Sequence, residues 1–369
     1  MSSTVLRQKV SGNSPDTYEG SYKDIFTHVN FNFSVFFKAR SSSQVGRPKA
    51  PIHALFAALV LKNLALNSSF RTVEAMIAQD SELAEILGFD PERPPSDSTL
   101  KRFFLQLELK DIRLAQAQLL HQLRALGYAQ GRIIALDSTP IEAHSRPPTK
   151  KGLPSKDPDA ARGFAKCKNG VYYGYKAQVV MDAEDYLPLY DITTPANVSD
   201  LKMVKPFIKP LKSLGYRPER ALLDAGYDSG ENHIALREGL GAISQICPNK
   251  RGSKKTYTHK PLKKYMRLLY QTTLDRFIPR EKRKKEYRKC CLVLHTVHNY
   301  KKFYRKRVAS EQHFATLKKD LFLEEHKLMT LKKLQKHVAL KCLCMLVLAL
   351  AALRMGLPEA MRSPKYFQH

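Results

Sequence analysis

The chain has 369 residues, 43% of them apolar, which is enough for one large and one smaller domain and excludes a globally disordered protein. Its net charge of +28 indicates a polyanionic partner, most simply nucleic acid, with a membrane surface as the rival. No apolar signal segment opens the chain, and the longest apolar run, residues 342–353, is too short to cross a bilayer. We therefore expect a cytoplasmic protein without a membrane role.

The first third of the chain is predicted to be helical. Residues 1–44 are polar and Ser-rich apart from an aromatic cluster at 31–37, and they predict a loosely ordered arm. Residues 45–130 predict a helical domain, with Ser69 as a helix cap and Gly88 as a helix end. The helices are expected over 52–66, 69–88, 98–108 and 111–127.

The short helix over 98–108 follows a tight turn at Pro94 and Pro95. This arrangement resembles a helix-turn-helix that presents Lys101 and Arg102 to DNA. A plain helical bundle explains the same pattern equally well, so both interpretations stay open.

Residues 131–369 alternate strands with helices, which predicts an α/β domain. The stretch 143–170, rich in Pro, Gly and Lys, predicts a mobile loop. Strands are expected at 133–136, on both sides of a turn near 182–187, and at 220–223, 242–247 and 291–297. Helices are expected over 199–215, with Ser199 or Asp200 as its cap, and over 231–241, 303–320 and 331–354.

The positive charge is concentrated in one segment. Residues 250–307 hold 21 Lys and Arg but only three acids, so 21 minus 3 gives +18 of the +28 in 58 residues. Tyrosines lie among these cations, which is typical of a folded surface rather than a bare tail. The segment, about 249–300, is predicted to be a phosphate-binding insert, with a merely solvated basic surface as the alternative.

Two aspartates follow apolar strands. Asp137 follows "IIAL" and Asp224 follows "RALL", and either one alone could simply be a turn-forming residue. Together, at the ends of adjacent strands, two carboxylates make an oxygen-ligand site suited to Mg²⁺. A two-metal site needs a further carboxylate, and Glu311 is the candidate.

The predicted helix over 303–320 supports Glu311. At 100° per residue, Tyr304, Arg307, Glu311 and Lys318 would share one narrow stripe of a continuous helix. The cations would suit a DNA phosphate beside the acid, and Tyr304 could stack on a base or bond to a phosphate. An ordinary exposed charged face with a Glu311–Arg307 pair is the alternative.

The spacing Tyr, two residues, Arg, three residues, Glu, six residues, Lys resembles the signature of the DDE transposases of IS4/IS5-type insertion sequences. The blocks "ALDST", "GYKAQVV", "TPANVSD" and "LDAGYDS" resemble other parts of that catalytic domain. The likeness covers roughly residues 45–350. It implies a ribonuclease-H-like fold, a mixed sheet flanked by helices, with the first Asp on the first strand and the second after the fourth.

The resemblance also implies site roles. Asp137, Asp224 and Glu311 would be the catalytic, metal-binding triad for two Mg²⁺ or Mn²⁺ ions, and Tyr304, Arg307 and Lys318 would contact DNA. The partners would be double-stranded DNA, both the terminal inverted repeats and the target, and further copies of the chain in a homodimer or higher oligomer. Such a transposase would work at the bacterial nucleoid. The alternatives are an inactive DNA-binding repressor and a related nuclease without strand transfer.

Other polar residues are given structural roles. Asp228 is interpreted as a helix cap rather than an outer metal contact, and Asp200 as a loop-shaping or capping residue. Cys290, Cys291 and His295 fit a strand better than a zinc site.

Overall fold

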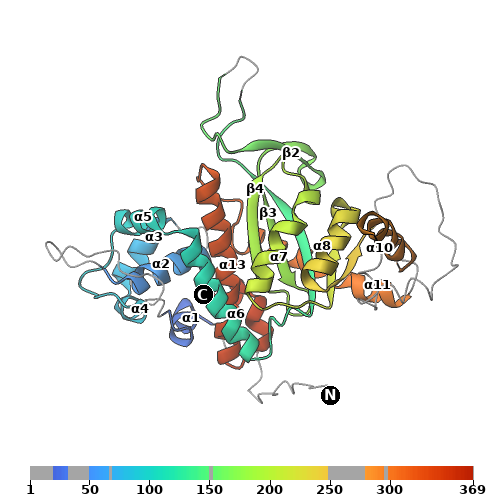
Figure 1. Cartoon of the computed structure of the whole chain (residues 1–369). Coiled ribbons are helices and arrows are strands. Elements are labelled where there is room, and N and C mark those ends of the chain that lie inside the picture. The colour runs from blue at the N-terminus through green and yellow to red at the C-terminus, as the bar shows by residue number, and fades with distance from the viewer. Residues whose placement is uncertain are drawn as a thin grey trace. The chain divides into compact units, whose positions relative to one another are not determined.

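The computed structural model describes residues 20–31, 50–65, 69–148, 153–247, 279–294 and 298–368. The chain divides into two compact units (Figure 1). The helical unit comprises Met1–Tyr128, Ala143–Pro158 and Ala315–His369. The sheet unit comprises Ala129–Glu142 and Asp159–Phe314.

Local capping explains where the N-terminal helices begin. The side chains of Ser69, Asp80 and Ser96 accept hydrogen bonds from the backbone N–H three residues later, so each satisfies a donor that a helix start leaves open. The helices of the unit are α1 (Tyr22–His28), α2 (Ile52–Leu64), α3 (Phe70–Gln79), α4 (Ser81–Leu87), α5 (Asp97–Gln106), α6 (Leu109–Ala125) and α13 (Leu331–Arg354), followed by the short 3₁₀ helices η7 (Pro358–Arg362) and η8 (Pro364–Phe367).

The core of the helical unit is α13, which packs against α1, α2 and α6. Among the described residues it is the one helix long and apolar enough to span a membrane. However, 94% of its apolar window is buried, as in the core helix of a soluble protein.

Two of the lysines in this helix, Lys336 and Lys341, are buried. Lys341 is buried, and its Nζ donates a hydrogen bond to the backbone carbonyl of Asn63 at 3.0 Å. Burial lowers the pKa of Lys341 from 10.5 to about 7, because the charged ammonium loses its hydration. The folded state therefore binds fewer protons than the unfolded state between about pH 7 and 10.5.

Stability should consequently rise with pH across that window. We expect Lys341→Met to raise the free energy of unfolding at pH 7 and to flatten its pH dependence by up to about 1.4 kcal/mol per pH unit. Urea unfolding from pH 6 to 10 measures this. Lys62, whose pKa burial also lowers, should keep part of the slope. Lys332→Met, an exposed position of the same helix, is the control, and equal curves for both variants would contradict the prediction.

In the described part of the sheet unit, six strands form one sheet. The order is β2-β3-β1-β5-β6, and β4 also pairs with β3. The β3 pairings are antiparallel, whereas β1–β5 and β5–β6 are parallel, so the sheet is mixed. The strands are β1 (Ile133–Glu142), β2 (Ala161–Ala165), β3 (Gly170–Asp182), β4 (Pro188–Pro195), β5 (Arg220–Leu223) and β6 (Ile243–Ile246).

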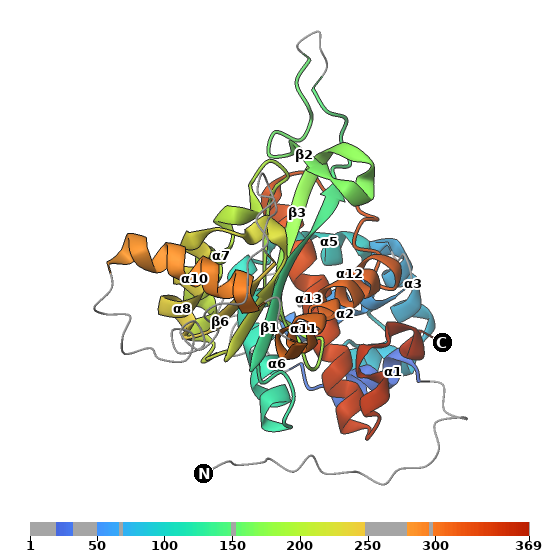
Figure 2. The same cartoon turned by 90° about the vertical axis from the view of Figure 1, so that its right-hand side faces the viewer.

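Helices flank this sheet. Figure 2 shows α7, α8 and α10 stacked on one another beside the strands. The helices are α7 (Val204–Ser213), α8 (Gly230–Leu240), α10 (Arg280–Leu294) and α11 (His298–Arg305), with the 3₁₀ helices η3 (Lys166–Lys168), η4 (Asp200–Lys202) and η5 (Ala225–Tyr227). The next helix, α12 (Val308–Lys319), begins in this unit. The mixed sheet with flanking helices agrees with a ribonuclease-H-like fold.

Several predicted elements differ from the structure. The helix over 69–88 is two helices, because Asp80 caps α4 and interrupts the run. Residues 161–165 of the predicted loop form strand β2, so Asp224 follows the fifth strand rather than the fourth. The predicted strand at 291–297 is wrong, because α10 extends through Leu294.

Other predictions lie partly outside the described residues. Most of the aromatic cluster at 31–37 and much of the insert at 249–300 belong there, as does His295. The domain boundaries at 44 and 130 stay a prediction.

Candidate active site

Strand register brings Asp137 and Asp224 together. Leu136 of β1 pairs with Leu223 of the parallel strand β5. Asp137 is the residue after Leu136, and Asp224 is the residue after Leu223. Neighbouring strands lie about 4.8 Å apart, so the two backbones hold these carboxylates side by side. The expectation that both acids end strands is corrected in part: β5 ends before Asp224, but β1 continues past Asp137 to Glu142.

Asp137 is held by three donors. Its Oδ1 accepts the backbone N–H of Ser138 at 2.8 Å. Its Oδ2 accepts from Arg307 Nη1 and from the Ser310 hydroxyl, each at 2.9 Å. These contacts fix the orientation of the carboxylate, whose side chain is only 16% exposed.

Asp224 is set by the turn that follows β5. Its Oδ1 accepts the backbone N–H of Gly226 at 2.8 Å, and a Cβ at residue 226 would lie only 3.0 Å from that oxygen. Glycine therefore lets the turn approach the carboxylate closely. Burial raises the pKa of Asp224, and the negative charge of Asp200 adds to the rise.

The charge of Asp224 also acts on Asp137. Burial is the main cause of the raised pKa of Asp137, and the charge of Asp224 raises it further. Arg307 acts in the opposite direction on both carboxyls. The pair thus forms a partly buried concentration of negative charge that favours a nearby cation.

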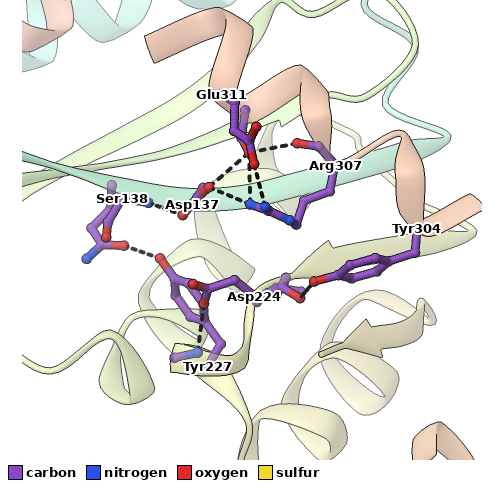
Figure 3. A network of polar contacts seen from close by, with 11 residues as sticks. Asp137, Ser138, Asp224, Tyr227, Tyr304, Arg307 and Glu311 are labelled. Atoms are coloured by element: carbon purple, nitrogen blue, oxygen red, sulfur yellow. Dashed lines mark hydrogen bonds and ion pairs between the residues drawn. The ribbon is translucent and has the colours of Figure 1, made fainter. Parts of the chain in front are cut away.

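Glu311 approaches this pair through Arg307 (Figure 3). Arg307 Nη2 donates to Glu311 Oε1 at 2.7 Å while Nη1 binds Asp137, so one guanidinium bridges the two acids. The Glu311 side chain is 61% exposed, unlike that of Asp137. The continuous helix predicted over 303–320 is wrong, because α11 ends at Arg305 and α12 begins at Val308. Arg307 lies in the turn between them, where its side chain can reach both acids.

Tyr304, on α11, is turned toward the backbone of the sheet. Its hydroxyl donates to the carbonyl of Leu223, the residue before Asp224, at 3.1 Å (Figure 3). Burial raises the pKa of this hydroxyl far above its ordinary value. The contact ties α11 to the end of β5, through a backbone partner that the sequence interpretation did not foresee.

The other predicted DNA contacts lie elsewhere on the chain. Lys318 is on α12, two turns after Glu311, and pairs with Glu324 at 2.7 Å. Lys101 and Arg102 are exposed on α5, where they are free of the core that Phe103 and Phe104 form.

Sequence reasoning missed a polar network beside Asp224. Asp200 Oδ1 accepts from Lys176 Nζ and Gln178 Nε2, each at 2.8 Å, instead of capping a helix. The buried Tyr227 donates to Gln178 Oε1 at 2.6 Å. The only sequence signal was indirect: alternate residues of "GYKAQVV" place Lys176 and Gln178 on one face of β3.

Asp228 anchors the basic helix α10. Its buried carboxylate binds Arg288 at 2.8 Å, while Ser229 is the residue that caps α8. Three further cations of α10, Arg280, Arg283 and Lys284, pair with Glu231 and Glu238 of α8. Part of the basic segment is therefore used to dock α10 on the sheet unit.

The donor chemistry of the carboxylates suits a hard divalent cation such as Mg²⁺. The raised pKa values of Asp137 and Asp224 show the unfavourable charge that such an ion would relieve. The three acids do not form a complete metal-binding geometry. In the described part of the chain, no three potential ligands lie close enough to hold one ion together, since Arg307 lies between Asp137 and Glu311.

Comparison with known families decides the identity. A model described as the transposase DDE domain matches residues 128–347, more than half of the chain. The chain belongs to the DDE transposase family. A second model, transposase domain (DUF772), matches residues 6–106 of this transposase, and the two together support the IS4/IS5-like type. No curated protein and no solved structure matches it.

Family membership establishes the activity. This transposase is an enzyme of DNA transposition, and its family cuts and joins DNA with the help of divalent metal ions. The matched region contains Asp137, Asp224, Glu311, Tyr304, Arg307 and Lys318.

Proposed function

We propose that Asp137, Asp224 and Glu311 form the catalytic triad, which holds two Mg²⁺ or Mn²⁺ ions while the transposase cuts insertion-sequence ends and joins them to target DNA. The observation that carries this proposal is the β1–β5 register, in which Asp137 and Asp224 follow a paired Leu136 and Leu223. Glu311 enters through its shared contact with Arg307.

When bound, two such ions supply charge neutralisation at the attacked phosphate and activation of the attacking and leaving oxygens. The chain's own residues prepare the carboxylates for this. Ser138 N–H and the Ser310 hydroxyl orient Asp137, and the Gly226 N–H orients Asp224. Tyr304 holds the end of β5 in place through Leu223.

Arg307 has two competing uses in this proposal. Its guanidinium neutralises Asp137 and Glu311, and the same fork of donors suits the oxygens of a DNA phosphate. We infer that Arg307 would leave Asp137 once that carboxylate holds a divalent ion, which would free the guanidinium to bind the phosphate. This exchange would assemble the metal site only when DNA is present.

No covalent enzyme–DNA intermediate is proposed. Water and then a DNA 3′-OH would attack phosphorus directly. The Tyr304 hydroxyl is a poor nucleophile, because it donates to a backbone carbonyl and burial raises its pKa. It is therefore assigned a positioning role.

The wider DNA surface is proposed from charge. Lys101 and Arg102 of α5 and Lys318 of α12 would contact DNA phosphates outside the cleavage site, and the basic segment would bind the terminal inverted repeats. We further propose that the transposase works at the bacterial nucleoid as a homodimer or higher oligomer, because two element ends have to be held together.

Cleavage and joining assays test this proposal. With DNA carrying the element's own ends, we expect nicking with Mg²⁺ or Mn²⁺ but not with Ca²⁺ or EDTA, and joined products when pre-cut ends and target DNA are supplied. Binding without cutting in either metal would instead favour an inactive repressor. Cutting without any joined product would favour a nuclease that lacks strand transfer.

A further inference from the structure

A cleft of about 800 Å³ lies in the sheet unit beside Asp224. One end of the cleft is at Gly226, two residues after Asp224. The other end is at the paired strands β2 and β3, where Phe164 and Val171 line it. Asp200, whose charge raises the pKa of Asp224, also lines it. The cleft is therefore continuous with the surroundings of the proposed catalytic carboxylates.

The far end of the cleft is apolar and exposed. Phe164 and Val171 are direct partners across the β2–β3 ladder, and they are 71% and 70% exposed. Leu201, from η4, also lines the cleft and is 44% exposed. Apolar side chains grouped in this way at a polar rim usually mark a binding surface.

The polar lining carries a positive surplus. The cations Lys176 and Arg288 line the cleft, but each is already paired, with Asp200 and Asp228 respectively. Arg162, two residues before Phe164 on the same strand, is an additional exposed cation. An aromatic ring with a guanidinium beside it offers contacts for a base and for its phosphate.

The platform that carries Phe164 is held firmly. A Cβ at Gly163 would lie 2.7 Å from the carbonyl oxygen of Ala196, so the backbone of β2 packs directly against the segment after β4. Phe164 is thereby presented from a fixed strand rather than from a loose loop.

We propose that this cleft binds an unpaired nucleotide of the DNA strand next to the cleavage point, with its base on Phe164 and its phosphate near Arg162. The inference rests on the proposed function. A volume of 800 Å³ falls within the range of about 300–1,000 Å³ typical of small-molecule sites, so it suits roughly one or two nucleotides and not the width of a duplex. The transposase would therefore hold the strand unpaired beside Asp224.

Photocrosslinking tests the position directly. End DNA with 5-iodouracil at each nucleotide around the cleavage point is bound to the full chain in EDTA, irradiated, and digested for mass spectrometry. We expect one flanking position to give a crosslink to the peptide that contains Phe164. Crosslinks confined to other peptides would overturn the proposal. EDTA makes the result independent of whether the enzyme cuts.

Binding of tailed and blunt DNA provides the second test. We expect wild type to bind an end with a short single-stranded tail about tenfold more tightly than the blunt end, as one base–aromatic stack allows. Phe164→Ala should lose this preference and keep its blunt-end affinity, with Phe164→Leu intermediate. For the tailed DNA, Arg162→Ala should reduce the slope of log affinity against log salt concentration by about one.

Matched controls separate nucleotide binding at Phe164 from a nonspecific effect of the substitution and from self-association. Leu126→Ala, which removes a side chain that is 48% exposed in the helical unit, should leave the preference unchanged. If Phe164→Ala keeps the preference for tailed over blunt DNA, the proposal is overturned. A loss of self-association by that variant in the absence of DNA would also overturn it, because this face would then bind a second copy of the chain. Normal cleavage together with either outcome would leave the proposed function standing.

Discussion

Asp224→Asn should reduce metal-dependent cleavage of end DNA at least about a thousandfold while DNA binding persists. Asparagine keeps the oxygen that accepts the Gly226 N–H, so the turn after β5 should stay intact. What is lost is the negative charge beside Asp137. Cleavage rates in Mg²⁺ and dissociation constants for the same DNA, measured side by side, check both parts.

Glu184→Gln is the matched control for this charge removal. Glu184 is an acid of the same unit that pairs with Lys306, and it is outside the proposed triad. Its variant should cut at close to the wild-type rate. Cleavage by Asp224→Asn within tenfold of wild type would remove Asp224 from the metal-binding residues.

Lys336→Met should destabilise the helical unit by about 3 kcal/mol. The Lys336 ammonium is buried in α13 and donates to the backbone carbonyls of Phe104, Leu105 and Leu107 at 2.8, 3.1 and 3.1 Å. It also lies over the ring of Phe104. Methionine fills the volume but leaves carbonyls around the end of α5 without their donor.

Urea unfolding at equal m-value measures this loss. Lys332→Met, at an exposed position one turn earlier on α13, should change the free energy of unfolding by no more than about 0.5 kcal/mol. Equal effects of the two substitutions would show that the buried contacts of Lys336 do not contribute the stability assigned to them.

The sequence predicted the fold well where a long apolar run or a clear turn leaves one interpretation. α13 was expected at its observed bounds, and β3 and β4 flank the predicted turn. Prediction and structure disagree where a short apolar stretch fits both a helix and a strand. The stretch "CLVLHTV" alternates like a strand, yet helix α10 extends into it. Prediction and structure also disagree where one residue interrupts a periodic run, as Asp80 does.

The candidate site was predicted in its residues more than in its geometry. Strand patterns pointed to Asp137 and Asp224, and the register places them side by side. The helical stripe that selected Glu311 is broken at Arg307, so the contact between them depends on a turn that periodicity cannot reveal. The contacts of Asp200 and Tyr227 were missed because their partners are distant in the sequence.

The central claim is that three acids jointly bind divalent ions in place of Arg307. A crystal structure of the transposase with its end DNA and Mn²⁺, with the ions located by anomalous scattering, tests it most directly. The account predicts manganese on the oxygens of Asp137, Asp224 and Glu311, with Arg307 moved from Asp137 to a DNA phosphate. Arg307 still bridging Asp137 and Glu311, with manganese bound elsewhere, would contradict it.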